Sequence, residues 1–221
     1  MVSASSGGND HPHAMFDRLM EVGVAGMVLN PGDHICAFYR GSAGRTEILI
    51  PYLEEGLREG EKCICFLEIG GERVVRDLLE KTAPEDLMAR HLHCLDFTQT
   101  YLRDGRFTQD QWFEFLDTCL ASAIHDEGYP RARAAGEMSW SLQKTCPGVE
   151  ELCSYEARIN WFAPRYPQIL LCMYDLDRFT GDVVVDVLKT HPRVLMNNMV
   201  IENPYYVDPA EFLAQKQPLS V

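Results

Sequence analysis

The stretch His34-Ile-Cys-Ala-Phe-Tyr39 is a continuous apolar run, and the short glycine-containing connection Tyr39-Arg-Gly-Ser-Ala-Gly-Arg-Thr46 continues from it. A strand that reads as one apolar run is typically buried on both faces, as in a parallel sheet covered by helices. Residues 46–59, which come next, carry apolar side chains at helical spacing. This order of strand, turn and helix predicts the first unit of an α/β sheet.

The same alternation continues along the chain. Further apolar runs that suit buried strands occupy residues 62–67, 92–97, 133–138, 169–174 and 193–199. Helical periodicity covers residues 46–59, 72–81, 109–125, 150–162 and 181–189. Alternating strands and helices indicate a mostly parallel sheet with helices on both faces, so we expect a three-layer α/β fold.

The domain organisation follows from where this alternation begins. We expect a disordered tail at residues 1–12, which are polar and rich in Gly and Ser, and a helix over residues 13–22 within an N-terminal segment 13–31. Residues 32–221 should then form a single domain, since neither a long linker nor an internal repeat interrupts them.

Composition restricts the classes of function. The chain has 221 residues, and 20 Lys and Arg against 33 Asp and Glu give 20 − 33 = −13. A surface that binds nucleic acid directly usually needs a basic stripe, so this acidic balance argues against one. The longest apolar run, residues 169–174, is far short of the roughly 20 residues that span a bilayer. The N-terminus lacks a secretion signal, and we expect a cytoplasmic protein without membrane contact.

Most of the 8 cysteines lie inside apolar stretches, where a reduced Cys behaves as a small buried hydrophobe. Short His and Cys spacings nevertheless give weak metal-ligand candidates, which are His34, Cys36, His91, His93 and Cys94. Two neighbouring ligands do not make a metal site, so we predict none and leave any cofactor unidentified. A metal or redox sensor that uses Cys36, Cys94 or Cys172 with a nearby His stays an alternative.

The connection after the first strand lies where a nucleotide-binding P-loop would lie. That loop has the pattern G-x-x-x-x-G-K-[ST], whose backbone amides cradle phosphates. Gly44-Arg45-Thr46 imitates its last three residues, but Tyr39 stands at the first glycine position and Arg45 at the lysine position. We expect a loop that keeps the shape of a P-loop without a functional Walker A sequence, in a protein that is not an enzyme.

In open α/β sheets, ligands bind at the carboxyl ends of the strands. Glu137 ends one predicted strand, where it could hold a metal or pair with Arg131 or Arg133. Asp175 ends another, where it either faces the crevice or caps the next turn, and Trp140 is either a pocket wall or part of the core. We predict a ligand-binding site formed by Tyr39, Arg45, Glu137, Trp140, Tyr174, Asp175 and His191.

Several segments together resemble one known family. They are Gly32-Asp-His-Ile-Cys-Ala-Phe-Tyr39, Arg133-Ala-Ala-Gly-Glu-Met-Ser-Trp140, Leu171-Cys-Met-Tyr-Asp175 and Leu188-Lys-Thr-His-Pro192. In this order they resemble the MEDS domain, the methanogen/methylotroph DcmR sensory domain. The resemblance covers residues 32–213 and implies a ligand-binding domain similar to the RecA/KaiC-type core with a degraded P-loop. It also implies small organic ligands, such as hydrocarbon derivatives, and links to DNA-binding domains, histidine kinases or anti-sigma-type regulators.

We therefore expect a stand-alone sensor that binds a small organic molecule and signals to a protein partner such as a kinase, an anti-sigma factor or a transcription regulator. Two alternatives stay open. A residual nucleotide binder would use Arg45, Thr46 and Glu137 with Mg²⁺. A protein-interaction regulator without a ligand would use its acidic surface to attract a basic partner, or would associate with itself.

Overall fold

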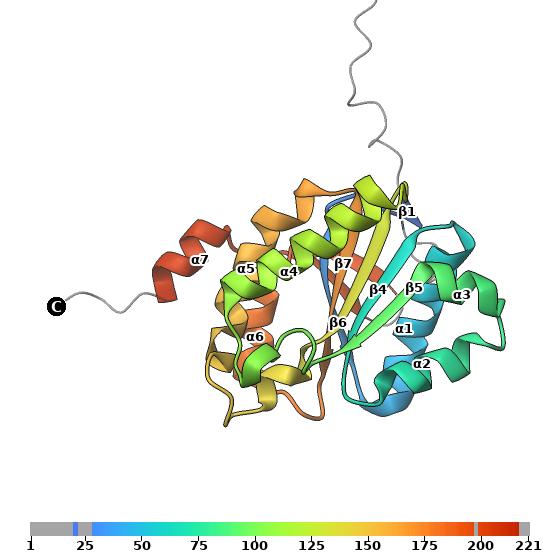
Figure 1. Ribbon diagram of the computed structural model, residues 1–221. Helices are drawn as coiled ribbons and strands as arrows, with labels where there is room; N and C mark the ends of the chain where they lie inside the picture. Colours follow the sequence, from blue (N-terminus) through green and yellow to red (C-terminus); the bar gives the residue numbers. More distant parts are fainter. Residues whose placement is uncertain (1–19, 22–27, 197–198, 217–221) are drawn as a thin grey trace, which may run out of the picture.

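The computed structural model describes residues 20–21, 28–196 and 199–216. Its main sheet has seven strands in the order β5-β4-β6-β7-β3-β8-β9 (Figure 1). In chain order the strands are β3 (His34–Tyr39), β4 (Lys62–Leu67), β5 (Leu92–Asp96), β6 (Ala132–Glu137), β7 (Gln168–Asp175), β8 (Arg193–Met196) and β9 (Met199–Glu202). All neighbours pair in parallel except β8 and β9, which pair antiparallel. The predicted mostly parallel sheet is confirmed.

Helices cover both faces of this sheet, which gives the three predicted layers (Figure 1). One face carries α1 (Gly41–Arg58), α2 (Gly71–Leu79) and α3 (Glu85–His91). The other carries α4 (Gln109–Ala121), α5 (Leu152–Phe162) and α6 (Gly181–Thr190), and α7 (Pro209–Lys216) packs against α5 and α6. No helix of the described segments combines the length and the apolar character that crossing a bilayer requires.

Strand β3 shows why the central strands read as continuous apolar runs. Cys36 and Phe38 face the α4–α6 side, whereas Ile35 and Ala37 face the α1–α3 side. Successive side chains of a strand point to opposite faces, so burial of both faces favours apolar residues at consecutive positions. His34, the first residue of β3, is the buried polar exception.

The structure differs from the sequence-based expectation at both ends of the domain. The predicted helix over residues 13–22 and the predicted tail over 1–12 lie outside the described residues, apart from Met20–Glu21, which form strand β1 and pair with β2 (Val28–Leu29). The single strand predicted over 193–199 is wrong. Met196 pairs with Met199 in the β8–β9 hairpin, and two asparagines, a residue type that favours turns, separate these residues in the sequence.

The expected P-loop shape is also wrong, because α1 begins at Gly41 and Arg40 alone separates it from β3. Gly44 and Arg45 therefore lie inside the helix rather than in a loop. A Cβ atom on Gly44 would lie 3.4 Å from the Cβ atom of Tyr39, so the first turn of α1 packs directly on the last residue of β3. This close packing leaves no loop that could wrap around a phosphate.

Candidate functional site

The carboxyl ends of the strands carry a polar cluster that includes four of the predicted site residues. Arg45 Nε lies 2.7 Å from Glu137 Oε1, and Glu137 Oε2 accepts the backbone N–H of Glu68 at 2.6 Å. Asp175 Oδ1 accepts the backbone N–H of Asp177 at 3.0 Å, so it caps the turn after β7, as one of the two predictions had it. The same oxygen also accepts the backbone N–H of Gly41 at 3.3 Å, at the start of α1. Tyr39 ends β3 and pairs in register with Asp175 on the neighbouring strand β7. Burial is the largest cause of the raised pKa of its hydroxyl, and the carboxylates of Glu137 and Asp175 raise it further.

The charges of this strand-end cluster are neutralised from within. Burial raises the pKa of Glu137, and the Arg45 guanidinium opposes that rise. Glu68 accepts from Ser139 Oγ at 2.6 Å and pairs with Arg178. Glu137 and Glu68 therefore each have a cationic partner within the cluster.

The alternative pairing of Glu137 with Arg131 or Arg133 is wrong. Both arginines instead bind Glu61, at the other end of the strands, with 2.7 Å between Arg131 Nε and Glu61 Oε1. Glu61 is fully buried and precedes β4, so it lies beside the start of β6, from which both arginines extend.

Trp140 belongs to an aromatic cluster rather than to the strand-end cluster. It lies on a 3₁₀ turn after β6 and is fully buried. The Tyr101 ring stacks on Trp140 with 4.8 Å between centroids and on Trp112 with 3.8 Å between centroids, so Tyr101 lies between the two indoles. Phe107 also contacts Trp140, with 4.3 Å between ring centroids. Among the described residues, Trp140 Nε1 has no hydrogen-bond acceptor.

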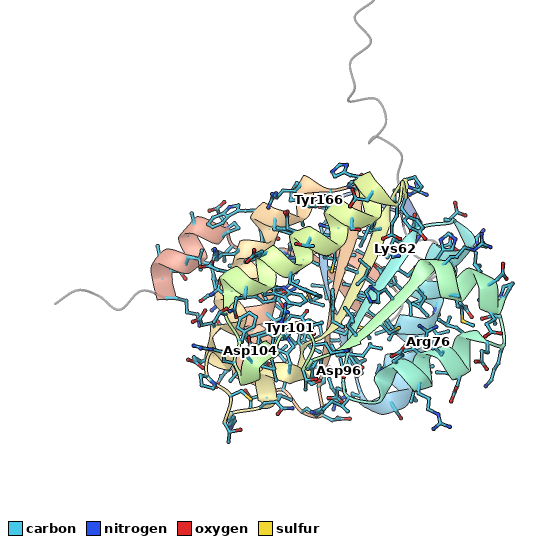
Figure 2. The ribbon with its side chains drawn as sticks, viewed as in Figure 1. Lys62, Arg76, Asp96, Tyr101, Asp104 and Tyr166 are labelled. Atoms are coloured by element: carbon cyan, nitrogen blue, oxygen red, sulfur yellow. The ribbon has the colours of Figure 1, made fainter. Side chains whose placement is uncertain are left out.

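A surface cavity of about 450 Å³ opens beside this aromatic cluster, at the carboxyl end of β5. The cavity lies between the segment after β5 and α4 as far as Thr118, and Figure 2 shows Tyr101 and Asp104 on that segment. Tyr101, Trp112 and Phe115 supply its apolar wall. Its charged groups are the cations of Arg103 and Arg106 and the carboxylates of Asp104 and Glu114. Tyr101 and Trp112 also line a small interior space of about 10 Å³, which is at the lower limit for holding one water molecule.

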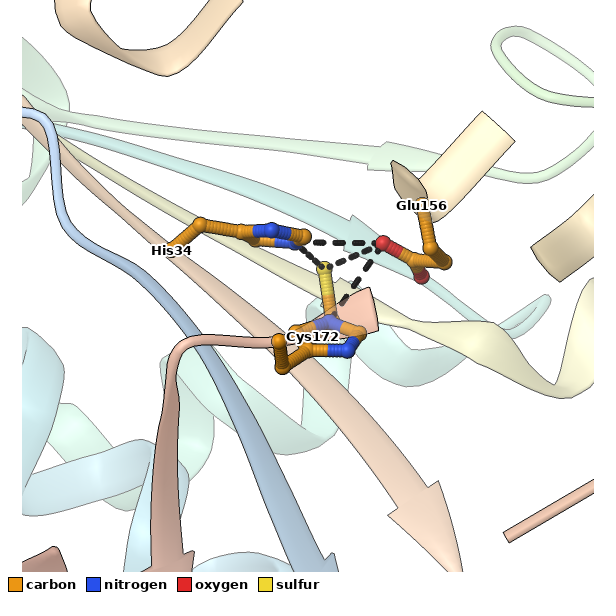
Figure 3. A group of neighbouring side chains, drawn as sticks. His34, Glu156 and Cys172 are labelled. Atoms are coloured by element: carbon orange, nitrogen blue, oxygen red, sulfur yellow. Dashed lines mark hydrogen bonds and ion pairs between the residues drawn. The ribbon is translucent and has the colours of Figure 1, made fainter. Parts of the chain in front are cut away.

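The remaining predicted residues, Tyr174 and His191, lie at a second, fully buried cluster on the α4–α6 side of the sheet. Figure 3 shows His34, Glu156 and Cys172 of this cluster. Its ligand atoms belong to His34 on β3, Glu156 on α5, Cys172 on β7 and His191 after α6, and all lie within 4.8 Å of one another. Tyr174 donates its hydroxyl to Glu156 Oε1. We call His34, Glu156, Cys172 and His191 the buried cluster.

Burial and close packing set the charges in the buried cluster. Burial, and next to it the charge of His191, lower the pKa of His34 to about 4. Burial also raises the pKa of the Cys172 thiol. For Glu156 burial acts in the opposite direction, but His191 and His34 together hold its pKa well below the usual range. Glu156 is therefore a buried carboxylate that needs positive charge beside it.

The structure places the five weak metal candidates apart. Only His34 belongs to the buried cluster, and Cys36 lies on the same strand two residues later. His91 ends α3 and contacts the backbone oxygen of Glu61 at 3.3 Å, whereas His93 and Cys94 lie on β5. Glu156 was not predicted from the sequence as a site residue. The signal for it was a charged residue at a buried position of the predicted helix over residues 150–162.

A model of a protein family matches residues 33–192, and its description is MEDS, the methanogen/methylotroph, DcmR sensory domain. The chain belongs to the MEDS family. The transcriptional repressor DcmR of Methylorubrum extorquens is 28% identical to this MEDS domain over 192 residues, which cover 83% of this chain and 67% of the repressor. Both findings indicate a sensory and regulatory role.

A solved structure supports the fold of the MEDS domain. A KaiC-like protein of Pyrococcus horikoshii matches it with a TM-score of 0.54 and 11% identity, over 80% of this chain and 79% of that protein. At this level of identity the likeness concerns the fold alone, and it agrees with the RecA/KaiC-like core that the sequence resemblance implied.

Proposed function

We propose that this MEDS domain is a non-enzymatic sensor that binds a small organic molecule and passes the signal to a protein partner that controls transcription. The observation that carries the proposal is the cavity of about 450 Å³ beside the stacked rings of Tyr101, Trp112 and Trp140. Ligand cavities in proteins are typically apolar and aromatic, with a few polar groups that orient the ligand.

The lining of the cavity favours a small molecule that is partly apolar and partly polar. Aromatic side chains would contact its apolar part, while the side chains of Arg103, Arg106 and Gln111 would contact its polar part.

The strand-end cluster has a supporting role in this proposal. Because Arg45 neutralises Glu137, and Asp175 accepts the first amide of α1, these groups fix the position of α1 rather than contact the ligand. The named function of the DcmR relative favours transcription as the regulated process. The net charge of −13 favours a protein partner over direct contact with DNA.

A thermal-shift screen tests the proposal. The probes are one- to six-carbon alcohols, halides, amines and carboxylates, each added at millimolar concentration to the full chain. We expect at least one compound to raise the melting temperature of the wild type. Thr118 is an exposed residue of α4 that lines the cavity, so Thr118→Trp should fill the cavity and abolish that shift.

The matched control fills a different hollow. Leu87→Trp alters a cavity of about 440 Å³ between α1 and α3, which has no aromatic wall, and it should leave the ligand shift intact. The proposal is overturned if no probe shifts the wild type, or if Thr118→Trp and Leu87→Trp respond alike.

A further inference from the structure

We propose that the buried cluster binds one divalent transition-metal ion, of which Zn²⁺ fits best, through His34 Nε2, Cys172 Sγ, His191 Nε2 and Glu156 Oε2. This inference does not rest on the proposed ligand-binding function. It also departs from the prediction, made from the sequence, that the protein has no metal site.

The distances between the ligand atoms fit a zinc site. Bonds of about 2.0–2.3 Å in a tetrahedral zinc site separate neighbouring ligand atoms by roughly 3.3–3.8 Å. Glu156 Oε2 lies 3.1 Å from His34 Nε2, 3.5 Å from Cys172 Sγ and 3.4 Å from His191 Nε2. His34 Nε2 lies 3.3 Å from Cys172 Sγ. Four separations between the donor atoms are therefore close to those of a tetrahedral site.

The Nδ1 atom of each imidazole donates a hydrogen bond away from the ligand atoms. The side-chain nitrogen of Asn160 donates to three backbone oxygens, the nearest being that of Thr190 at 2.8 Å, so its Oδ1 is an acceptor. His34 Nδ1, 3.2 Å away, therefore donates to it. His191 Nδ1 donates to the backbone oxygen of Val187 at 2.8 Å. With both Nδ1 atoms used as donors, the Nε2 atoms are the ring nitrogens left to bind a metal ion, and both lie within the same group of ligand atoms.

This arrangement is the one that metal-bound histidines adopt, since their second ring nitrogen usually donates to a carbonyl or carboxylate oxygen. The side chains of the buried cluster also leave one polar atom without a partner. The Tyr174 hydroxyl donates to Glu156 Oε1, and the Cys172 thiol donates to Glu156 Oε2. His191 Nε2 has no hydrogen-bond partner among the described residues.

A divalent cation would give His191 Nε2 a partner and would balance the negative charge of the cluster. A Cys172 thiolate and a Glu156 carboxylate carry two negative charges, and an M²⁺ ion balances both in a site where every ligand is at most 5% exposed. Two imidazoles, a thiolate and a carboxylate suit Zn²⁺, whereas Mg²⁺ and Ca²⁺ prefer oxygen ligands alone. Four protein ligands leave no open position, so the ion would be structural and would link β3, β7, α5 and the start of β8.

Metal analysis tests the inference on the full chain, purified without a His tag or chelator. We expect about one zinc per chain by inductively coupled plasma mass spectrometry. After unfolding with chelator and refolding with Co²⁺, we expect the absorption band of a thiolate–cobalt charge transfer. Cys172→Ser should lose both the band and the bound metal. Cys36→Ser, which changes the neighbouring buried thiol on β3, is the matched control and should keep both.

A milder variant keeps the test independent of folding defects. Asn160→Ala removes only the acceptor for His34 Nδ1, and loss of such an outer partner typically weakens metal affinity about 10–100-fold. The inference is overturned if the wild type neither contains zinc nor takes up one equivalent on refolding with excess Zn²⁺. It is also overturned if Cys172→Ser retains the cobalt band, or if one equivalent of copper or iron occupies the wild type in place of zinc.

Discussion

Arg45 Nε lies 2.7 Å from Glu137 Oε1, and this ion pair lies at the start of α1, where a nucleotide-binding protein of related fold holds a phosphate. The Glu137 side chain is only 2% exposed, so its carboxylate has little access to water and relies on Arg45 for neutralisation. At this place the protein therefore holds its own carboxylate, that of Glu137, and not the phosphate of a bound nucleotide.

Breaking this pair should destabilise the domain. Arg45→Met leaves Glu137 buried without its counter-charge, and such a change typically lowers the free energy of unfolding by about 3–5 kcal/mol. Urea unfolding measures the loss, and Arg45→Met combined with Glu137→Leu should recover most of it. Arg40→Met is the control, because it breaks the Arg40–Asp177 pair, whose side chains are 67% and 51% exposed. A loss no larger for Arg45→Met than for Arg40→Met would contradict the assignment.

The same loss should depend on pH. The pKa of Glu137 is raised in the folded state, chiefly by burial, so the carboxyl group costs stability when it is ionised and not when it is protonated. Below the ordinary pKa of 4.5 the group is neutral in both the folded and the unfolded state. The stability difference between Arg45→Met and the wild type should therefore shrink as the pH falls from 7 to below 4.5. A difference that stays constant or grows towards acid pH would show that Glu137 is not its cause.

Mg²⁺ and ATP should leave the melting temperature unchanged. The reason is that Glu137 already pairs with Arg45 in α1, and that Asp175 already accepts the backbone N–H of Gly41, the first residue of this helix. The measurement is a thermal-shift assay with millimolar nucleotide, and Mg²⁺ alone at equal ionic strength is the control. A nucleotide-dependent rise that Arg45→Ala removes would instead establish the residual nucleotide binder.

Gly148→Ala should disturb the loop that carries the aromatic cluster. Gly148 has a φ of +88°, and a Cβ atom there would lie 2.0 Å from the backbone oxygen of Phe107. The left-handed backbone and the forced displacement together predict a loss of about 2–5 kcal/mol. Gly128→Ala is the matched control, since φ is +77° and no atom lies within 4 Å of the added Cβ, so its loss should be about 1–2 kcal/mol. Equal losses in urea unfolding would contradict the predicted clash.

Alkylation should separate the cysteines by burial and pKa. Burial raises the pKa of Cys119 to about 11 and that of Cys153 to about 12, so at pH 8 only about one Cys119 in a thousand is a thiolate. Cys146 lies on a turn between β6 and α5 and is half-buried, so we expect iodoacetamide to modify it first. Peptide mass spectrometry identifies the site, Cys146→Ser should remove the fast phase, and Cys119→Ser should keep it. Early labelling of a buried thiol such as Cys63 would contradict this order.

The sheet could be predicted because burial on both faces leaves a local record in the sequence. β3 and β4 match the predicted ranges because every position in them except Lys62, the first residue of β4, is buried. Strand β9 left no such record, because it lies at the edge of the sheet and three of its four residues are exposed. Helix α3 was missed for a related reason: it is short, and Met88 is its only buried residue.

The sites could be predicted only where topology brings the residues to one edge. Arg45, Glu137 and Asp175 meet as expected, because the carboxyl ends of parallel strands share an edge, although their mutual ion pairing was not foreseen. The buried cluster joins His34 to His191, which lie at opposite ends of the domain in sequence, and no local spacing connects them. The sequence left Trp140 undecided between pocket and core, because its partner Tyr101 lies in an irregular segment without periodicity.

Strand β3 has one further consequence, for synthesis. It lies near the middle of the sheet, and both of its neighbours, β7 and β8, come late in the chain. As the chain leaves the ribosome, β3 therefore has no partner while strands β4, β5 and β6 and helices α1 to α5 emerge. An unpaired apolar strand readily associates with other chains. A nascent chain halted before residue 168 exposes this strand, so the native topology forms only after most of the protein has been translated.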